Sequence, residues 1–224
     1  MEIRQQVNGL NLKFIHGYRG FDCRDNLFYI NDGTCIVYHA AAAGIVFNLV
    51  ENTQKFYLQH DDDIISLCIN DKYKNTVATG QIGQKAQIHI WDVNTMETLS
   101  ILSGLHTQGV CSVGFSRSGK LLVSVGLDKN HTIGIWRWKE GSLAASAVGD
   151  SRRIFRVMFR PDSDTVFVSV GFKHVKFWNI AGSELIKKNG VLTDSEMSSA
   201  KLKKMPTMLS IAFGLVNFRF YFYR

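Results

Sequence analysis

The chain has 224 residues, of which 46% are hydrophobic, and a formal net charge of +7. This length and composition allow a sizeable core and exclude a disordered chain or a Pro-rich linker. The four cysteines, at positions 23, 35, 68 and 111, show neither disulfide-framework nor zinc-ligand spacing, so we expect a reducing compartment and no metal or other cofactor. The polar start MEIRQQVN is not typical of a signal peptide or membrane anchor, so the expected location is cytoplasmic.

The positive charge is concentrated in the second part of the chain. Residues 1–150 contain 13 Lys and Arg against 14 Asp and Glu, whereas residues 151–224 contain 13 against 5. The basic residues include Arg152, Arg153, Arg156, Arg160, Lys187, Lys188, Lys201, Lys203 and Lys204. Such a surface attracts nucleic acid, an anionic membrane or an acidic protein, and an ordinary solvated face is the plainer alternative. No RNA-binding motif, zinc finger or basic helix accompanies the charge, so we expect no nucleic-acid partner.

The first forty residues do not fit a simple repeat. Residues 12–33 read LKFIHGYRGFDCRDNLFYINDG, a run rich in glycine and apolar residues. This content suits a structural joint, so Tyr18 and Phe21 are expected to pack in a core.

Aromatic residues then mark a repeat, at Phe47, Trp91, Trp136 and Trp178, with separations of 44, 45 and 42 residues. That interval is the length of a four-stranded propeller blade. Each interval also contains an apolar strand, a polar turn and a second apolar strand, as in SVGFSRSGKLLVSVG. The sequence therefore predicts an all-β WD-repeat β-propeller, with about three full blades plus incomplete first and last units. Trp138 is expected on the blade surface or at an inter-blade contact.

This pattern divides the chain into three regions. Residues 1–59 hold the glycine-rich run and a partial first blade, and residues 60–185 hold the repeated blades. Residues 186–224 hold a basic linker and a truncated final blade with a divergent apolar tail. Closed propellers have four to eight blades, so this chain is not expected to close a normal ring and should expose strand edges.

One blade carries polar residues where WD-repeat blades connect their strands. These residues are His106, Ser124, Asp128 and Trp136, and hydrogen bonds among them would satisfy buried polar groups. The matching places hold His60, Thr79, Gly83 and Trp91 in the preceding blade, and Ser169, Lys173 and Trp178 in the following one. We therefore expect a complete network in one blade only. A Ser, His and Asp set also suggests hydrolysis, but no strained nucleophile turn accompanies Ser124, so no catalytic residue is assigned.

Two further patterns resemble ligand sites. Residues 114–121, GFSRSGKL, lack the hydroxyl residue and the following helix of a phosphate-binding loop, so a hairpin turn is expected. Asp61, Asp62 and Asp63 could bind a divalent cation, but neighbouring side chains of an extended segment point to opposite faces. A solvated loop is the favoured interpretation.

The tail from Thr207 to Arg224 has three interpretations. Its apolar run is shorter than the roughly twenty residues of a membrane-spanning helix, so we expect no membrane partner. A strand that pairs with another copy or a partner fits FRFYFY. A truncated or alternative end that packs poorly is the third.

The run from Leu12 to Gly33 resembles the hydrophobic motif of the echinoderm microtubule-associated protein-like family. The matching residues are Gly17, Tyr18, Arg19, Gly20, Asp22, Arg24 and Asn26. The segments HDDDIISL, VATGQ and TMLSIAFG are also similar to that family, and the resemblance covers about residues 1–214. It implies a non-enzymatic protein of the cytoplasm and cytoskeleton that binds tubulin or microtubules and affects their assembly. The chain resembles the longer type lacking the coiled coil, in a truncated or alternative form.

Two classes of function follow from these observations. In the first, the protein docks on the acidic surface of tubulin through Arg152, Arg153 and Arg156, guided by electrostatic attraction. In the second, it is a WD-repeat adaptor that binds another protein or peptide on a blade face and has no cytoskeletal role. Ionic strength separates the two, because charge-led docking weakens as salt rises.

Overall fold

The computed structural model describes residues 6–7, 10–190, 205–213 and 220–223. Regular structure in these residues is almost entirely β, which confirms the expected all-β class. The helical exceptions are two short 3-10 turns, η1 (Asn31–Gly33) and η2 (Trp138–Glu140). A short ribbon of β1 (Gln6–Val7) and β2 (Leu10–Asn11) precedes the main body.

Four antiparallel sheets of four strands follow one another along the chain, and we call them blades 1 to 4. Blade 1 consists of β3 (Leu27–Ile30), β4 (Cys35–Ala40), β5 (Ala43–Asn48) and β6 (Thr53–Tyr57). Blade 2 consists of β7 (Ile64–Ile69), β8 (Thr76–Gln81), β9 (Ile88–Asp92) and β10 (Thr98–Leu102). Blade 3 consists of β11 (Val110–Phe115), β12 (Leu121–Gly126), β13 (Ile133–Arg137) and β14 (Ser142–Ala147). Blade 4 consists of β15 (Ile154–Phe159), β16 (Val166–Gly171), β17 (His174–Ala181) and β18 (Glu184–Asn189).

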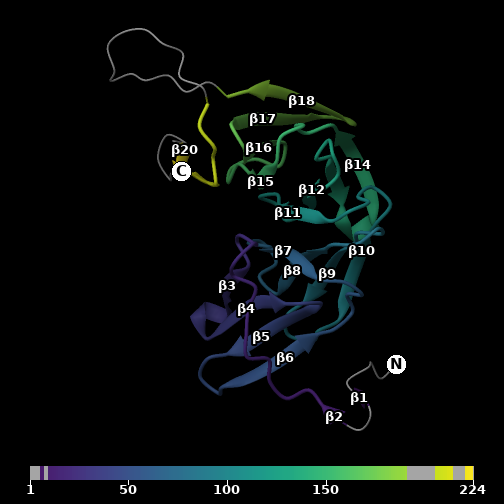
Figure 1. Ribbon diagram of the computed structural model, residues 1–224, viewed down its shortest axis with the longest axis vertical. Coiled ribbons are helices and arrows are strands. Elements are labelled where there is room, and N and C mark those ends of the chain that lie inside the picture. Colours follow the sequence, from purple (N-terminus) through teal and green to yellow (C-terminus); the bar gives the residue numbers. More distant parts are fainter. Residues whose placement is uncertain (1–5, 8–9, 191–204, 214–219, 224) are drawn as a thin grey trace.

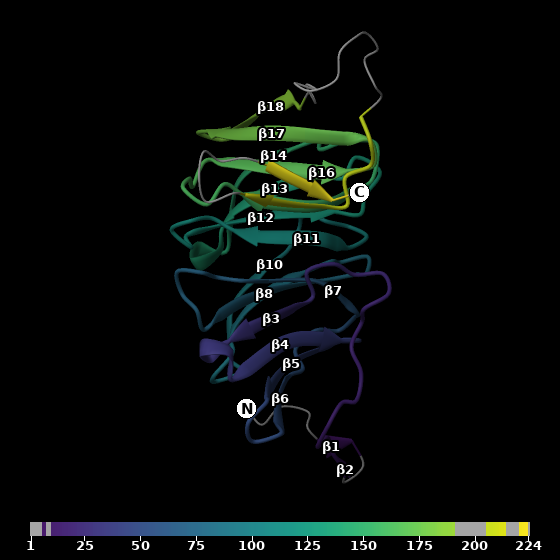
Figure 2. The same ribbon diagram turned by 90° about the vertical axis from the view of Figure 1, so that its left-hand side faces the viewer.

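The blades form an open arc, as Figure 1 shows. Within each blade the strands pair in chain order, and the first strand lies on the inner side of the arc. Figure 2, seen from that inner side, shows the four sheets stacked one above another. A two-stranded sheet of β19 (Ser210–Phe213) and β20 (Phe220–Tyr223) lies beside blade 4. The arrangement is that of a partial β-propeller.

The propeller class is confirmed, with one change at the first unit. That unit was expected to be incomplete, but it contains all four strands. Strand β3 is short and lies within the glycine-rich run, so its alternation was hidden by the neighbouring irregular sequence. The tail residues 220–223 pair with β19 of the same chain, and residues 214–219 lie outside the described residues.

The middle strands of the blades are apolar because neighbouring blades cover both of their faces. In β12, the side chains of Leu122, Val123 and Val125 are fully buried. The turn between β11 and β12 contains Gly119 at φ +70°, and an added Cβ would lie 2.4 Å from the Asn70 side chain. A residue with a side chain would be strained there. The segment GFSRSGKL is thus a hairpin turn, as expected, with a strand after it.

Buried tryptophans fill spaces between blades. The ring of Trp91 is fully buried and stacks on Tyr57 of blade 1, with centroids 4.7 Å apart. Gly44 of blade 1 allows this approach, since a Cβ there would be 2.8 Å from the Trp91 ring. Trp138 is also buried, in a cluster with Leu102 of blade 2, which is the inter-blade place that the sequence allowed.

Candidate protein-interaction surface

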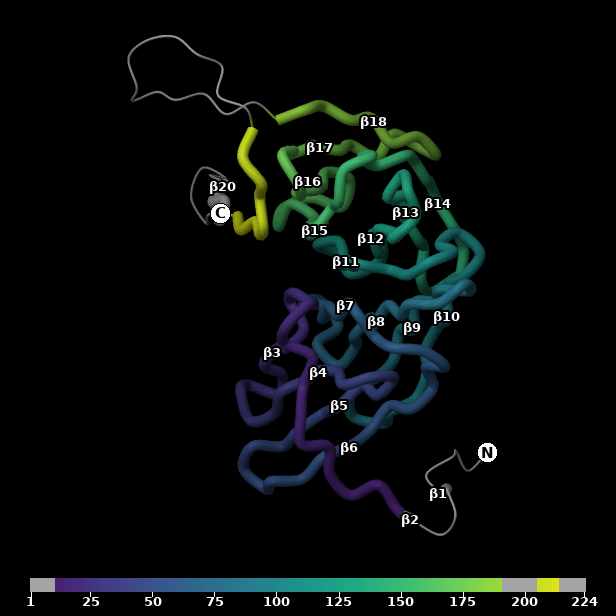
Figure 3. Tube along the Cα trace, in the orientation of Figure 1, coloured from purple at the N-terminus to yellow at the C-terminus, as the bar shows by residue number. Residues whose placement is uncertain are grey.

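The segment before blade 1, residues 12–26, runs along that blade on the inner side of the arc (Figure 3). It contains the glycine-rich motif, and we call it the motif segment. The Ile15 backbone amide donates to the Gln54 Oε1 at 2.8 Å, and the Gln54 amide nitrogen donates to the Ile15 carbonyl at 3.2 Å. The Phe14 ring packs edge-on against Phe47. These contacts anchor the segment to β5 and β6.

Arg19 connects the motif segment to two blades. Its guanidinium forms ion pairs with Asp22 and with Asp63, each at 2.8 Å, and its backbone amide donates to the His39 carbonyl of blade 1. The hydrogen bonds from Arg19 lower the pKa of Asp22 to about 2. The amide of Asn26 donates to the Arg19 carbonyl. The polar residues of the motif thus form ion pairs and hydrogen bonds with one another and with the loop before blade 2.

The aromatic residues of the motif do not pack as expected. Tyr18 is 53% exposed and Phe21 is 87% exposed, so the prediction of core packing for both is wrong. The backbone position of the motif is determined by Arg19 and Asn26 instead. Tyr18 contacts the edge of the Tyr38 ring, with centroids 6.5 Å apart, and Phe21 lies under the Arg19 guanidinium at 5.8 Å. Both rings remain available at the surface.

Arg156, one of the three candidate tubulin-contact residues, is used inside the molecule. Its Nε forms an ion pair with Asp25 of the motif segment at 2.8 Å, and the side chain is only 18% exposed. Its Nη1 donates to the Ser210 hydroxyl and to the Ile211 carbonyl of β19. Arg156 therefore links the motif segment, blade 4 and β19.

Arg152 and Arg153 are both exposed, at the start of blade 4. Arg152 forms an ion pair with Asp150 at 2.9 Å and donates to the Lys173 carbonyl, but its side chain remains 45% exposed. The Arg153 guanidinium lies 5.4 Å from the centre of the Phe155 ring. Lys187 and Lys188 belong to β18, whereas Lys201, Lys203 and Lys204 lie outside the described residues.

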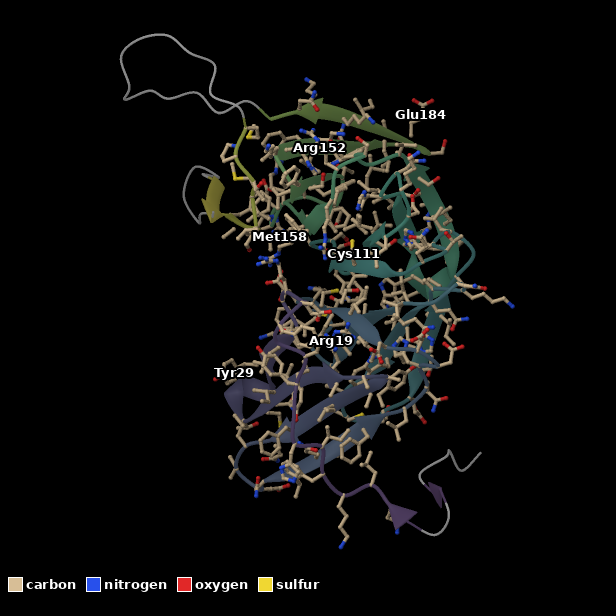
Figure 4. The ribbon with its side chains drawn as sticks, in the orientation of Figure 1. Arg19, Tyr29, Cys111, Arg152, Met158 and Glu184 are labelled. Atoms are coloured by element: carbon tan, nitrogen blue, oxygen red, sulfur yellow. The ribbon has the colours of Figure 1, made fainter. Side chains whose placement is uncertain are left out.

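A cavity of about 490 Å³ lies between the motif segment and the blades, and we call it the motif cleft. Arg19, Gly20, Phe21, Asp22, Cys23 and Arg24 line it from the motif segment; Ile65, Ile82, Cys111, Leu127, Arg153, Ile154 and Phe155 line it from blades 2 to 4. In Figure 4, Arg19 and Cys111 lie in the middle of the arc and Arg152 lies farther toward blade 4. The cleft combines basic groups with apolar walls.

The polar network of blade 3 is buried. The Trp136 indole nitrogen donates to the Ser124 hydroxyl at 2.7 Å, and the His106 Nε2 lies 2.7 Å from the same oxygen. Asp128 lies apart from this chain of bonds, because its carboxylate accepts from the Thr132 amide and hydroxyl. Ser124 is fully buried, so no substrate can reach its hydroxyl, and burial lowers the pKa of His106 to about 4. The hydrogen bonds of His106, Ser124 and Trp136 therefore connect the loop before β11 with β12 and β13.

Blade 2 contains a second network, so the expectation of a complete network in one blade only is wrong. The Thr79 hydroxyl lies 2.7 Å from the His60 Nε2 and accepts from the Trp91 indole at 3.1 Å. The other nitrogen of His60 lies 2.6 Å from the Gln81 Oε1. Gln81 thus does for His60 what Asp128 was expected to do for His106. Gly83 carries no side chain to join in.

Blade 4 has a buried ion pair in the corresponding place. Asp150 stands four residues before the first strand, as His60 and His106 do in their blades. Its carboxylate lies 3.0 Å from the Lys176 ammonium, and both side chains are at least 90% buried. Burial alone would raise the pKa of Asp150, but the hydrogen bonds from Arg152 and Lys176 outweigh it and hold the pKa well below its usual range. Lys173 was noted as a departure from the pattern, and the polar contact in this blade comes instead from Asp150, at the histidine place, and Lys176.

The three adjacent aspartates are engaged within the protein. Asp61 accepts from the Gln81 amide at 2.5 Å, Asp62 accepts from the Asp63 backbone amide, and Asp63 binds Arg19. Among the described residues, no group of three His, Cys, Asp or Glu could hold a metal ion. All four cysteines are free. No helix in the described ranges has the length and apolar character needed to cross a membrane.

The fold and its buried networks define a repeat protein of the WD-type propeller class. The family described as "Echinoderm microtubule-associated protein first beta-propeller" matches residues 53–217, and the HELP motif matches residues 7–45. The chain belongs to this echinoderm microtubule-associated protein family. The resemblance inferred from the motif residues is thereby confirmed.

Curated relatives agree with this assignment. The chain is 34% identical over 213 residues to the 77 kDa echinoderm microtubule-associated protein of Lytechinus variegatus, which covers 91% of this chain and 31% of the relative. It is 33% identical over 198 residues to the human echinoderm microtubule-associated protein-like 2, covering 84% of this chain and 30% of the relative. The chain therefore spans less than a third of the length of these relatives.

Proposed function

We propose that this chain is a non-enzymatic propeller protein of the cytoplasmic cytoskeleton that associates with microtubules and affects their assembly. Membership of a family whose relatives are named as microtubule-associated carries this proposal. Arg152 and Arg153 are the proposed contact residues, because both are exposed at the start of blade 4. Arg156 has a supporting role in this proposal, since its guanidinium is bound to Asp25 and β19.

Electrostatic attraction is the proposed basis of the contact. Tubulin presents an acidic surface, and exposed guanidinium groups accelerate association with such a surface. This attraction weakens as the salt concentration rises. The described lysines of blade 4 add to the same charge, notably Lys173 and Lys187. The division of the chain into regions 1–59, 60–185 and 186–224 stays a prediction.

Co-sedimentation with polymerised microtubules tests the proposal at low and physiological salt. We expect pelleting that depends on microtubules, falls as salt rises, and falls further in Arg152→Gln and Arg153→Gln variants. Arg137→Gln is a matched control, because Arg137 is exposed at the opposite end of blade 3 and has the same charge. Pelleting without microtubules would indicate self-association. A soluble, folded protein that never pellets would contradict the proposal.

The alternative is a WD-repeat adaptor that binds a protein or peptide without a cytoskeletal role. The motif cleft favours it, since a cavity with both guanidinium groups and apolar walls suits a peptide. Pelleting with microtubules supports the first function. Binding of a peptide in a separate assay, without pelleting, supports the adaptor.

A further inference from the structure

Two arginine side chains in the motif cleft share one aromatic ring. The Arg24 guanidinium, from the motif segment, lies 5.6 Å from the centre of the Phe155 ring. The Arg153 guanidinium, from the start of blade 4, lies 5.4 Å from the same centre. Residues 129 positions apart in the sequence therefore bring two positive charges to one phenyl group. A ring face attracts each cation but does not neutralise its charge.

Neither guanidinium has a carboxylate partner in the described part of the chain, which sets them apart from their neighbours. Arg19 is paired with Asp22 and Asp63, Arg152 with Asp150, and Arg156 with Asp25. The acidic residues nearest to Arg24 in the sequence, Asp22 and Asp25, are thus already used by other arginines. Arg24 and Arg153 are both exposed and remain uncompensated. Two like charges that line one cleft favour the binding of an anion there.

The fold holds this pair in place. The ion pair between Asp25 and Arg156, at 2.8 Å, ties the chain next to Arg24 to the strand that contains Phe155. Arg19 ties the other end of the motif to the loop before blade 2. A side-chain pair that is positioned before binding loses less conformational entropy when it meets a ligand.

The rest of the cleft favours a peptide over a simple anion or a nucleic acid. Its walls include Ile65, Ile82 and Leu127, and Phe21 lies at the surface with 87% exposure. Aliphatic walls can pack with peptide side chains, whereas a phosphate backbone offers the cleft charge alone. A cavity of about 490 Å³ has room for a few side chains.

We propose that the motif cleft binds a short acidic peptide segment, whose carboxylates contact Arg24 and Arg153 and whose apolar side chain packs against Ile82, Leu127 and Phe21. Guanidinium groups recognise carboxylates through paired, charge-assisted hydrogen bonds. This site rests on the adaptor alternative, which it deepens by naming the peptide's chemistry. Arg153 is common to it and to the proposed microtubule contact, whereas Arg24 belongs to the cleft alone. A peptide carboxylate supplies the charge that the fold leaves unmatched there.

Fluorescence anisotropy of the whole chain with a fluorescein-labelled peptide of four glutamates around one phenylalanine tests this site, in the absence of tubulin. We expect saturable binding that weakens at least tenfold in Arg24→Gln and in Arg153→Gln. Arg137→Gln, the matched control, should change the Kd by less than twofold. Replacing the peptide glutamates with glutamine should abolish binding, and replacing the phenylalanine with alanine should weaken it severalfold.

Three outcomes would overturn the site. Equal losses in Arg24→Gln and Arg137→Gln would show a general attraction to net positive charge. No binding by the folded wild type at millimolar peptide would show that the cleft does not recognise peptide carboxylates. Tighter binding of a single-stranded oligonucleotide, lost in the same two variants, would assign the cleft to nucleic acid. Circular dichroism melts of each variant separate loss of binding from loss of fold, and the microtubule assay with Arg152→Gln scores the proposed function separately.

Discussion

Blades 2 and 3 differ from blade 4 in the contacts that satisfy the buried polar groups at the same position of the repeat. In blades 2 and 3, a histidine four residues before the first strand approaches a Thr or Ser hydroxyl that also accepts from the repeat tryptophan. In blade 4, Trp178 still donates to Ser169 at 2.9 Å, but Asp150 and Lys176 form an ion pair in place of the histidine contact. The same position of the repeat therefore holds neutral hydrogen bonds in blades 2 and 3 and a buried ion pair in blade 4. The comparison indicates that the repeat requires a satisfied polar group there rather than a particular residue.

The largest effect should follow from removing the lysine of blade 4. Lys176→Met leaves Asp150 with Arg152 as its remaining charged partner, so we expect the free energy of unfolding to fall by about 3 kcal/mol. Urea denaturation measures this loss. The double variant Asp150→His with Lys176→His reproduces the blade 2 residues His60 and His89 and should lose less than the single variant. A double variant that is less stable than Lys176→Met would contradict the equivalence of the two arrangements.

Removing the shared hydroxyl of blade 3 should have a smaller effect. Ser124→Ala leaves the buried Trp136 indole N–H without its acceptor, which should lower the free energy of unfolding by about 1–3 kcal/mol. Thr79→Val in blade 2 makes the same change with nearly constant volume and should give a similar loss. Ser142→Ala, at a more exposed position in blade 3, serves as the control. A loss below that of the control would show that the network adds no stability.

Acid should destabilise the blades mainly through their buried histidines. Burial lowers the pKa of His60 and of His106 to about 4, and that of His89 to about 3. The unfolded chain takes up protons on these groups near pH 6.5, so the stability they give is present above that pH and is lost as pH falls toward 4. At pH 5 each should cost roughly 1–2 kcal/mol, since one pKa unit corresponds to about 1.4 kcal/mol.

Urea midpoints measured from pH 7.5 to 5 test this dependence. The carboxylate of Asp150 has a pKa far below this range, so it should contribute little to the slope. The buried His174 of blade 4, whose pKa burial also lowers, should contribute with the other histidines. His89→Gln should reduce the slope, because it removes one of the groups that binds a proton on unfolding. If the dependence of the urea midpoint on pH is the same in this variant, groups other than His89 cause the loss of stability in acid.

The smallest effect should come from the exposed member of the blade 4 group. Arg152→Gln removes an ion pair with Asp150, but the Arg152 side chain is 45% exposed and Lys176 still pairs with Asp150. Exposed ion pairs contribute at most about 1 kcal/mol, so stability should change by less than that. Chemical denaturation checks it. A loss as large as that of Lys176→Met would mean that Arg152 stabilises Asp150 as much as the buried Lys176 does.

The propeller class was accessible from the sequence because its repeat depends on local patterns. Aromatic residues recur at Phe47, Trp91, Trp136 and Trp178, and alternating strands with turn residues lie between them. The place of Asp150 could also have been read from its distance to β15, which matches that of His60 and His106 to their strands. The Asp150–Lys176 pair was missed because no residue was assigned to that place of blade 4 in the sequence pattern.

The candidate site was less accessible, because its residues come from distant parts of the chain. The charge count singled out Arg152, Arg153 and Arg156 together, although Arg156 is bound to Asp25 and β19. Tyr18 and Phe21 were expected in a core because both are aromatic, but the motif is held by the polar contacts of Arg19. Composition gives the sign of a charge and not its partner.

The sequence by itself determined the class of fold, the family and the basic character of the second half, since periodicity, motif spacing and net charge are properties of a linear chain. Only the tertiary structure decided that the first unit is a complete blade, and that Arg24 and Arg153 meet on Phe155. Those contacts join the motif segment to blade 4 across the inner side of the arc. Which charges are neutralised depends on distances of a few ångströms between such segments, and folding alone sets those distances.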